Sequence, residues 1–470
     1  MPEAKAHPRL QMGLIYAALS TAIVSSLGML LVPSISREMD VSVSAAQWML
    51  TLNLMVGAVA TPVMGRLSDG PHKKRLLLSA LSIILVGSML AATAQNFTVF
   101  LIGRGLQGLT YGIVPVTISL ARRYLPKEHV QSSISSLSVT VSSGLGVGYP
   151  LTGIVAGIFD FRFAFWFAAL FVVTAIIVVS RTVPARPDGH AALVPFDYVG
   201  ACLLGLGLGA LLLAVSEGPN WGWGSPWTIS AFILAACVLT TWVQAGLRTP
   251  HPLINLRVFR NAEVLLANCT AIGLGAALYI GISMSSLVAQ APSSTGYGVA
   301  LPVFWAGWVM LPLSVGSFVA NRLVRRLSHR IRLATLLSVG AGIVAASGIL
   351  LWFAHTELWE ILLGMLLFGL GMGASYAAMP ALIARSVAAA ELGSSVSFNQ
   401  VLRTVGSSFG TAVSGAVLAA NMAPDLHATG GGISTTFAIG ALLCTAVFVA
   451  LLLHNLMSRR LRAGETDLVG

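Results

Sequence analysis

The sequence predicts an all-α polytopic membrane protein with fourteen transmembrane helices, and three observations lead to this prediction. Of its 470 residues, 56% are hydrophobic and 9% are charged, whereas a typical soluble domain has about 25% charged residues. The chain also contains repeated, nearly uncharged runs of about 20 residues, which is long enough to cross the hydrocarbon core. Finally, its basic residues fall mainly on one side of these runs. Only helices and closed barrels satisfy backbone polar groups in lipid, so such runs predict helices.

The runs are separated by short loops that are too small to fold as separate domains. They cover residues 12–34, 47–66, 76–94, 98–121, 133–156, 162–180, 197–216, 226–247, 264–289, 300–321, 333–354, 360–384, 396–420 and 433–457. We expect two six-helix halves, at 12–181 and 264–457, with two additional helices at 197–247 between them. Residues 1–11 and 458–470 would be cytoplasmic tails.

A weak internal repeat supports this division. Three residues of the fourth run recur 265 positions later in the twelfth, and three of the fifth recur 262 positions later in the thirteenth. The pairs are Gly108 and Gly373, Tyr111 and Tyr376, Pro115 and Pro380, Gly144 and Gly406, Gly148 and Gly410, and Gly153 and Gly415. Repeated helical halves around a central site are a common transporter architecture.

The net charge of +11 reflects topology rather than nucleic-acid binding. If both termini are cytoplasmic, 23 of the 27 Lys and Arg residues fall in cytoplasmic segments. This distribution is the positive-inside pattern of a multi-pass protein of the cytoplasmic membrane. The 23 Arg and 4 Lys residues hint at a GC-rich bacterial genome.

The segment "GRLSDGPHKKR", residues 65–75, joins the second and third runs. Its tight turn holds Asp69 beside a basic cluster that could pair with neighbouring helix ends and separate as the halves move. The candidate gate residues are Gly65, Arg66, Asp69 and Arg75. The alternative is a solvated loop that only follows the positive-inside rule.

Arg104 and Arg403 lie within predicted membrane helices, where a charge is costly and usually faces an interior. Gln107 and Tyr111 share the helix face of Arg104, while Asn399 shares that of Arg403. Three explanations remain open: the arginines bond backbone carbonyls, pair with acids at helix ends, or meet an anionic group of a substrate.

A central cavity would be lined by polar and aromatic residues of the first, second, fourth and fifth runs and their counterparts in the second half. The candidates are Tyr16, Asn53, Gln107, Tyr111, Asn268, Tyr279, Trp305, Trp308, Tyr376, Asn399 and Gln400. Arg104 and Arg403 would set the charge of this cavity.

Several motifs resemble those of the major facilitator superfamily. The loop at 65–75 resembles that family's loop signature, "RGLQG" at 104–108 its fourth-helix motif, and "GLGVGYPLTG" at 144–153 its antiporter motif. Together with "FDYVG", "SEG" and "LRVFRN", the fourteen runs resemble the fourteen-span drug:proton antiporter family.

The resemblance implies a gate formed by Arg66, Asp69 and Arg75 and a part for Arg104 in proton coupling. It also implies an exporter-type bend in the fifth helix. The residues that would shape this bend are Gly144, Gly148, Pro150 and Gly153. Packing alone is the alternative explanation for the glycines.

The chain departs from that family in its first helix, which has no acid. The family's Asp aligns near Val24, and the sixteen acids all lie in loops, tails or helix ends, with Glu217 and Glu263 the deepest. A proton carrier needs a group that titrates near the working pH. The absence of an acid in the cavity favours neutral or anionic substrates.

We therefore expect a monomeric secondary exporter of amphipathic, neutral or anionic small molecules such as drugs or natural products, exchanged for protons by alternating access. No nucleotide-binding loop or metal-ligand spacing occurs, so no cofactor, metal or nucleic acid is expected. A gradient-independent or dedicated exporter of a neutral or anionic metabolite is the alternative, and a membrane-embedded enzyme or receptor is the alternative class.

Overall fold

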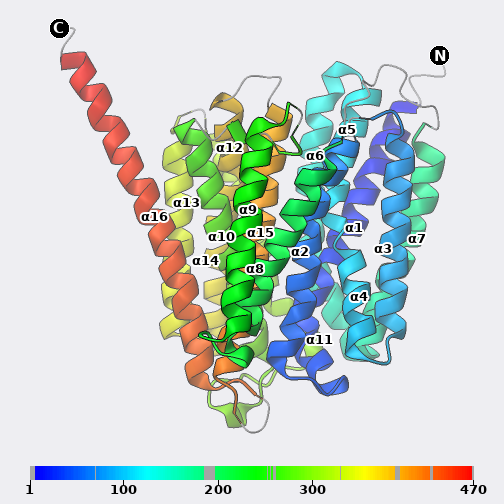
Figure 1. Cartoon of the computed structure of the whole chain (residues 1–470), viewed down its shortest axis with the longest axis vertical. Coiled ribbons are helices and arrows are strands. Elements are labelled where there is room, and N and C mark those ends of the chain that lie inside the picture. Colours follow the sequence, from blue (N-terminus) through cyan, green and yellow to red (C-terminus); the bar gives the residue numbers. More distant parts are fainter. Residues whose placement is uncertain are drawn as a thin grey trace.

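The chain folds into long helices that run side by side (Figure 1). The structure, a computed structural model, describes residues 6–68, 70–184, 196–250, 252–254, 256–257, 261–328, 330–386, 392–423 and 427–467. Within these residues the regular elements are helical, apart from an isolated bridge between Met422 and Ala428.

Two groups of helices are joined by a helical hairpin. The first group comprises α1 (Ala6–Glu38), α2 (Val43–Leu67), α3 (Lys73–Thr93), α4 (Phe97–Gln107), α5 (Thr110–Tyr124), α6 (Lys127–Ile158) and α7 (Phe161–Thr182). The hairpin is α8 (Tyr198–Trp221) and α9 (Pro226–Arg248). The second group comprises α10 (Ala262–Gln290), η2 (Ser293–Thr295), α11 (Val303–Val309), α12 (Leu311–Leu327), α13 (Leu333–Phe353), α14 (Leu358–Ser386), α15 (Leu392–Ala420) and α16 (Gly430–Asp467).

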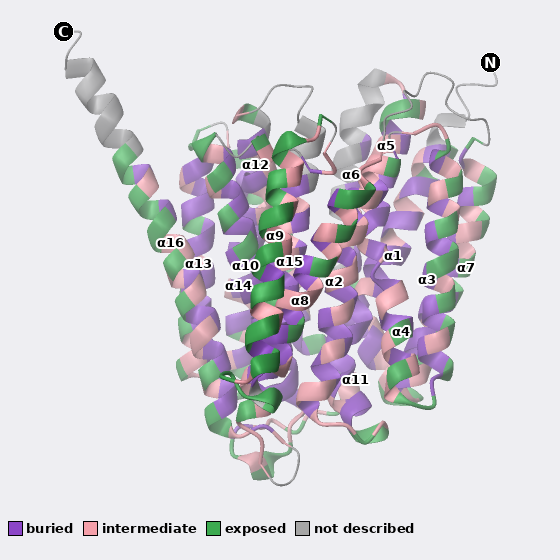
Figure 2. Cartoon of the chain, in the orientation of Figure 1, coloured by how far each residue is buried: buried purple, intermediate pink, exposed green. Residues whose placement is uncertain are grey.

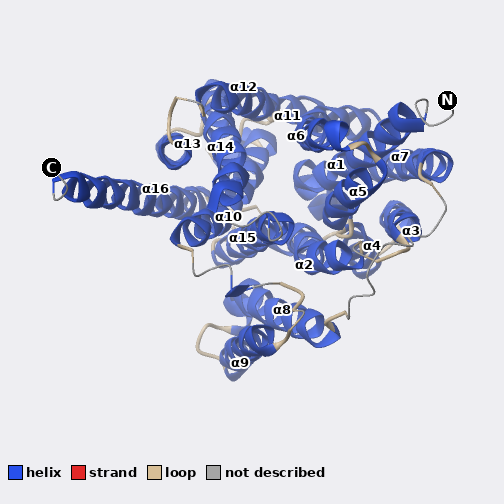
Figure 3. Cartoon of the chain, turned by 90° about the horizontal axis from the view of Figure 1, so that it is seen from above, coloured by secondary structure: helices blue, strands red, loops and turns tan. Residues whose placement is uncertain are grey.

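Seen along the helices, the two groups lie side by side, and α8 and α9 stand outside them (Figure 3). The hairpin packs through α8 against α15 and α2, so it covers a place where the two groups meet. The start of α1 and the end of α16 lie at the same end of the molecule, which we call the termini end (Figure 1). The loop between α1 and α2 lies at the opposite end, which we call the far end.

Twelve helices of the described residues are long and apolar enough to cross a membrane, so the predicted count of fourteen is not confirmed. The two predicted spans that do not qualify correspond to α6 and α15. The described apolar part of α6 is the short segment Val147–Ile158. In α15 the reason is polarity, because Asn399, Gln400 and Arg403 lie along it with several serines.

Two spans that the sequence predicts as continuous are interrupted. The fourth divides into α4 and α5 around Gly108, and the tenth divides into α11 and α12 at Met310. A Cβ on Gly108 would stand 2.6 Å from the carbonyl oxygen of Asn53, so only glycine permits this approach of α2. In α12, Pro312 occupies the first turn, where a missing N–H costs no helical hydrogen bond.

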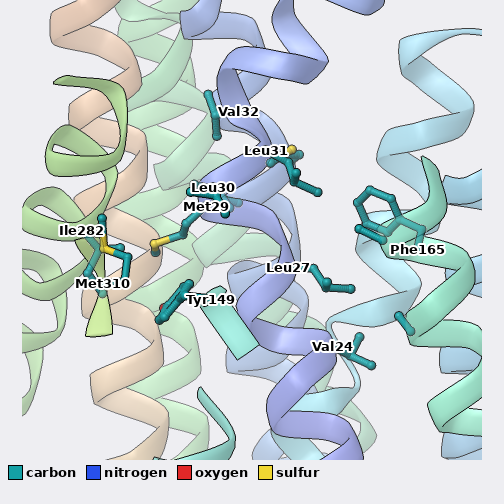
Figure 4. Close-up of a cluster of buried hydrophobic side chains, with 14 of the residues drawn as sticks. Val24, Leu27, Met29, Leu30, Leu31, Val32, Tyr149, Phe165, Ile282 and Met310 are labelled. Atoms are coloured by element: carbon teal, nitrogen blue, oxygen red, sulfur yellow. The ribbon is translucent and has the colours of Figure 1, made fainter. Parts of the chain in front are cut away.

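Burial distinguishes central from peripheral helices (Figure 2). In the most apolar window of α1, 78% of the residues are buried, compared with 6% in α9. In the core around α1, Leu27 lies toward Phe165 of α7, whereas Met29 lies toward Ile282 of α10 and Met310 (Figure 4). The apolar surface of α9 suits contact with lipid, and α1 is a central helix that contacts both groups.

Candidate functional site

A hydrogen bond between two tyrosines joins the two groups of helices. The hydroxyl of Tyr111 on α5 lies 3.0 Å from that of Tyr279 on α10. Tyr111 can approach α2 because Gly57 has no side chain there: a Cβ on Gly57 would stand 2.4 Å from the Tyr111 ring. Both tyrosines are half-buried. The bond places two neutral hydroxyls, each able to donate or accept, at the boundary between the groups.

Arg403 provides the positive charge of this boundary in the second group. Its guanidinium carbon lies 4.3 Å from the ring centroid of Tyr376 on α14, and it donates a hydrogen bond to the side-chain oxygen of Gln400. A guanidinium over an aromatic ring is stabilised by the ring quadrupole and keeps donors available. The Tyr376 hydroxyl is buried and has no partner in the structure.

Arg104 lies deeper in the first group and is 1% exposed. It donates to the side-chain oxygen of Gln107, whose amide nitrogen donates in turn to Ser88 of α3 at 2.8 Å. The amide of Asn53 on α2 donates to the backbone oxygen of Arg104 at 2.9 Å. The guanidinium of Arg104 also lies beside Gly28 of α1, where a Cβ added to the glycine would stand 2.6 Å from a terminal guanidinium nitrogen.

The partners of the two arginines narrow the three explanations that the sequence leaves open. In the part of the chain that the structure describes, both guanidiniums bond side-chain amide oxygens, and neither bonds a backbone carbonyl or a carboxylate. Among the described residues, neither of the first two explanations is observed. Nε of Arg104 is buried and has no hydrogen-bond partner among the described residues, so this donor is not satisfied by them.

The two predicted asparagines bond each other away from the tyrosines. The amide of Asn399 on α15 donates to the side-chain oxygen of Asn268 and the backbone oxygen of Ala267, both on α10. Both of these hydrogen bonds from Asn399 lie within the second group. The contact fixes α15 against α10, the same pair of helices that Gly406 and Gly410 bring close together.

The glycines of α6 allow close packing with two different helices. Gly144 and Gly148 lie against α1, where added Cβ atoms would stand 2.7 Å from Ala22 and 2.0 Å from Ser26. Gly153 lies against α11, where an added Cβ would stand 2.8 Å from the carbonyl oxygen of Val303. Pro150 is buried inside α6. These residues thus make helix contacts within and between the groups.

The predicted gate residues lie at the termini end. Gly65 and the half-buried Arg66 are in the last turn of α2, and Arg75 is exposed in the first turn of α3. Asp69 lies outside the described residues. The neighbouring Lys74 donates to the backbone oxygens of Ser180 and Val183, at the end of α7. That bond satisfies carbonyls that a helix end leaves free.

The structure does not bring three predicted cavity residues to the tyrosines and arginines. Tyr16 bonds Thr174 of α7 at 2.7 Å, within the first group. Trp305 and Trp308 are 57% and 40% exposed and line a separate apolar groove with Leu362 of α14. Helical spacing does not distinguish a face toward the interior from one toward lipid, and tryptophan suits both.

Sequence reasoning missed residues that join the groups toward the far end. Thr51 of α2 bonds Thr411 of α15 at 2.9 Å, and Gln47 donates to Ser283 of α10 at 2.7 Å. Tyr149 of α6 is 5% exposed and lies beside α1 in Figure 4. Only the polarity of these side chains inside apolar runs could have indicated them.

Several curated transporters resemble the chain in sequence. It is 26% identical over 409 residues to an uncharacterized MFS-type transporter of Mycobacterium tuberculosis, covering 86% of this chain but 58% of the relative. It is 25% identical to the Multidrug resistance protein B homolog of the same organism, covering 85% of this chain and 77% of the relative. It is 23% identical to the Multidrug transporter protein MdtP of Bacillus subtilis, covering 86% and 74%.

Solved structures of transporters share the fold. The nucleoside transporter NupG superposes with a TM-score of 0.67 at 12% identity, covering 94% of this chain and 99% of that chain. The peptide transporter POT with bound sulfate gives 0.69 at 14% identity, covering 94% of each chain. These neighbours are transporters, not enzymes. Residues 13–411 match the Major Facilitator Superfamily, and the chain belongs to this family of multi-pass membrane transporters.

Proposed function

We propose that the protein is a secondary active exporter of small molecules in the cytoplasmic membrane of a bacterium, with both termini in the cytoplasm. In this proposal the termini end faces the cytoplasm and the far end faces outward. The multidrug transporters among its relatives support export. The positive-inside distribution of the basic residues supports the orientation.

We include α6 and α15 among the membrane-spanning helices, which makes fourteen. They are 32 and 29 residues long, and they pack against the central helices α1 and α10. Polar residues of α15 are turned toward its neighbours, as the bonds of Asn399 and Thr411 illustrate. A helix whose polar face is covered by protein can cross a bilayer despite low mean hydropathy.

The observation that carries this proposal is the meeting of Tyr111 and Tyr279 between the groups, beside the helices that hold Arg104 and Arg403. These residues come from α4, α5, α10 and α15. A substrate bound among them would contact both groups at once, as alternating access requires.

The charge of these residues favours neutral or anionic substrates that carry an aromatic or apolar portion. Two guanidiniums act on the site, and in the described residues none of their bonds goes to a carboxylate. Arginine donors suit carboxylate or phosphate groups, and the tyrosine rings suit an apolar body. A cation would meet unfavourable charge at the same place.

Matching glycine contacts support two related six-helix halves, 12–181 and 264–457. Gly108 packs on α2 and Gly373 on α12, while Gly148 packs on α1 and Gly410 on α10. Gly153 of the first half contacts α11 of the second half. Its counterpart Gly415, in the second half, lies nearest α2 of the first half. Each of these glycines in the first half therefore has a counterpart in the second half that contacts the equivalent helix. This is the pattern expected if a two-fold axis relates the halves.

Exchange for protons is the energy source that we propose, because the sequence has no nucleotide-binding loop for ATP hydrolysis. Gradient-independent export of a neutral or anionic metabolite by a single monomeric chain is the second candidate. This second candidate is favoured by Val24, which is apolar and fully buried. Val24 occupies the position at which the resemblance predicts an acid that would serve proton coupling.

The test measures the accumulation of cationic, neutral and anionic compounds in efflux-deficient cells expressing the chain, with and without a protonophore. We expect neutral or anionic compounds to be excluded and the protonophore to abolish the exclusion. An Arg104→Ala variant and an Asp197→Asn variant, each checked for membrane expression, serve as site and remote controls. Selective exclusion of cations would contradict the proposed site, and exclusion that ignores the protonophore would favour the second candidate.

A further inference from the structure

The α8–α9 hairpin covers the place where α2 of the first group meets α15 of the second (Figure 3). Apolar side chains of α8 pack against both helices. Leu208 shares one apolar cluster with Ala58 of α2 and Val401 of α15. Leu212, one turn nearer the far end, shares a second cluster with Ala412 of α15. A separation of α2 from α15 therefore detaches α8 from one of them.

The packing of α8 against α2 is loose. A Cβ added to Gly205 of α8 would stand 3.8 Å from Val59, and one added to Gly209 would stand 3.9 Å from the sulfur of Met55, which are ordinary van der Waals distances. By contrast, a Cβ added to Gly406 of α15 would stand 2.1 Å from a backbone oxygen of α10. Lipid tails are as apolar as leucine, so apolar contacts without close packing do little to hold two membrane helices together. Apolar packing alone therefore holds α8 against α2 only weakly.

The hairpin is attached more firmly to α15. It packs more extensively on α15 than on α2. The segment after α9 contributes Ile254, which is 6% exposed and lies in one apolar cluster with Phe398 of α15. The Asp197 carboxylate, just before α8, accepts a hydrogen bond from the backbone N–H of Leu253 at 3.0 Å, so this segment is also tied to the start of α8. We therefore expect the hairpin to move with α15.

One hydrogen bond joins this hairpin to the first group near the far end. The indole N–H of Trp48 on α2 donates to one carboxylate oxygen of Glu217 on α8 at 2.9 Å, and the amide of Asn220 donates to the other oxygen at 2.9 Å. In the part of the chain that the structure describes, no other hydrogen bond connects α8 or α9 to either group. A hydrogen bond to an ionised acceptor is roughly twice as strong as one between neutral groups. The Trp48–Glu217 bond is thus the specific attachment of the hairpin to α2.

Trp48 lies beside a bond that joins α2 to α15. Thr51, three residues further along α2, bonds Thr411 of α15 at 2.9 Å. If α15 carries the hairpin with it, this end of the molecule cannot open until Trp48 releases Glu217. We propose that the hairpin holds the far end closed through the Trp48–Glu217 hydrogen bond, which breaks as the two groups separate. This inference rests on the alternating access proposed for the exporter.

The experiment measures a distance across the far end in the purified full-length protein in lipid nanodiscs. Spin labels are attached to Arg37→Cys in the last turn of α1 and Ala420→Cys at the end of α15, both exposed positions, after the four native cysteines are replaced. Pulsed electron paramagnetic resonance then gives the populations of molecules with a closed and an open far end. In this labelled parent protein we expect the short distance of the closed far end to predominate.

Two variants weaken the bond to different degrees. Trp48→Phe removes the donor and keeps an aromatic ring, so we expect the ratio of open to closed molecules to rise about tenfold. Glu217→Gln keeps an acceptor but loses the charge, so the ratio should rise less. The double variant should open no further than Trp48→Phe, since both changes act on one bond.

Trp227→Phe is the matched control, because it removes an indole N–H from the hairpin at the same end of the molecule. Trp227 is 74% exposed on α9, and its variant should leave the distances unchanged. Unchanged distances in Trp48→Phe, an equal change in Trp227→Phe, additive opening in the double variant, or a parent protein that is mainly open would each overturn the proposal. The readout requires neither substrate nor transport, so the distances can respond even if the accumulation assay contradicts export, and the reverse.

Discussion

A single hydroxyl pair, Tyr111 and Tyr279, connects α5 of the first group to α10 of the second. A neutral hydrogen bond adds only about 0.5–1.5 kcal/mol to stability, so this contact can break without unfolding the protein. The two hydroxyls are therefore suited to exchange their mutual hydrogen bond for hydrogen bonds to a substrate.

We predict that Tyr111→Phe and Tyr279→Phe each lower the unfolding midpoint slightly, and that the double variant is no less stable than either single variant. Each single change leaves one hydroxyl without its partner, whereas the double change removes both, and their coupling should be about 1 kcal/mol. Thermal unfolding in nanodiscs measures all four proteins. Additive losses would show that the two hydroxyls are not coupled.

The role of Arg403 in substrate binding can be tested with two variants, one that loses only the planar guanidinium group and one that also loses the positive charge. Arg403→Lys keeps the charge but not the planar group over Tyr376, and Arg403→Gln removes both. In the accumulation assay of the exporter, we expect Arg403→Gln to abolish exclusion of anionic compounds and Arg403→Lys to weaken it. Equal activity of Arg403→Gln and wild type on anions would remove Arg403 from the substrate site.

The sequence indicated which polar residues lie inside apolar runs, but not which neighbours they contact. A spacing of 3.6 residues per turn predicts that Arg104, Gln107 and Tyr111 share one helix face, whereas the structure places Arg104 and Gln107 on α4 and Tyr111 on α5. The same spacing could not exclude Trp305 and Trp308, which face a groove on the outside. Which neighbour a helix face meets depends on packing between distant segments, and a single sequence contains little information about that packing.

At the scale of helices, small residues determine where backbones approach. Gly108 lies at the break between α4 and α5 and allows α2 to pass close to it. The sequence identified this glycine through its repeat partner Gly373, but it predicted one continuous helix across residues 98–121. Membrane length and apolar composition favour a helix without specifying a local turn, which arises here from contact between helices.

We predict that Gly108→Ala destabilises the protein by about 1–3 kcal/mol, because its Cβ would overlap the Asn53 carbonyl and overpacking costs this much. Gly105→Ala is the matched control: it lies three residues earlier in the same span, and its added Cβ would stand 3.5 Å from Leu52, an ordinary contact. Thermal unfolding should separate the two variants. Equal midpoints would contradict the packing argument.

At the scale of the molecule, several contacts between the two groups gather toward the far end. Thr51 and Thr411 join α2 to α15, while Ser286 and Gln290 of α10 donate to backbone oxygens of Met29 and Leu30 on α1. Alternating access requires these contacts to separate during each cycle. No property of the sequence predicted them, because they join residues more than 200 positions apart.

We predict that a disulfide between Thr51→Cys and Thr411→Cys abolishes transport, because it holds the far end closed. The two hydroxyl oxygens are 2.9 Å apart, which suits a cross-link once Cys202, Cys237, Cys269 and Cys444 are replaced. Uptake into inside-out vesicles of a compound established as a substrate measures the effect, and dithiothreitol should restore activity.

A second disulfide separates closure of the far end from the general effect of a cross-link. Ser25 of α1 and Thr110 of α5 bond each other at 3.1 Å within the first group, so Ser25→Cys with Thr110→Cys is the matched pair. If the groups move as rigid units, this cross-link leaves transport intact while the far-end cross-link stops it. Transport that survives the far-end disulfide would mean that α2 and α15 do not separate. Inhibition by both pairs would show that α1 and α5 must also move within the first group, so the groups would not be rigid units.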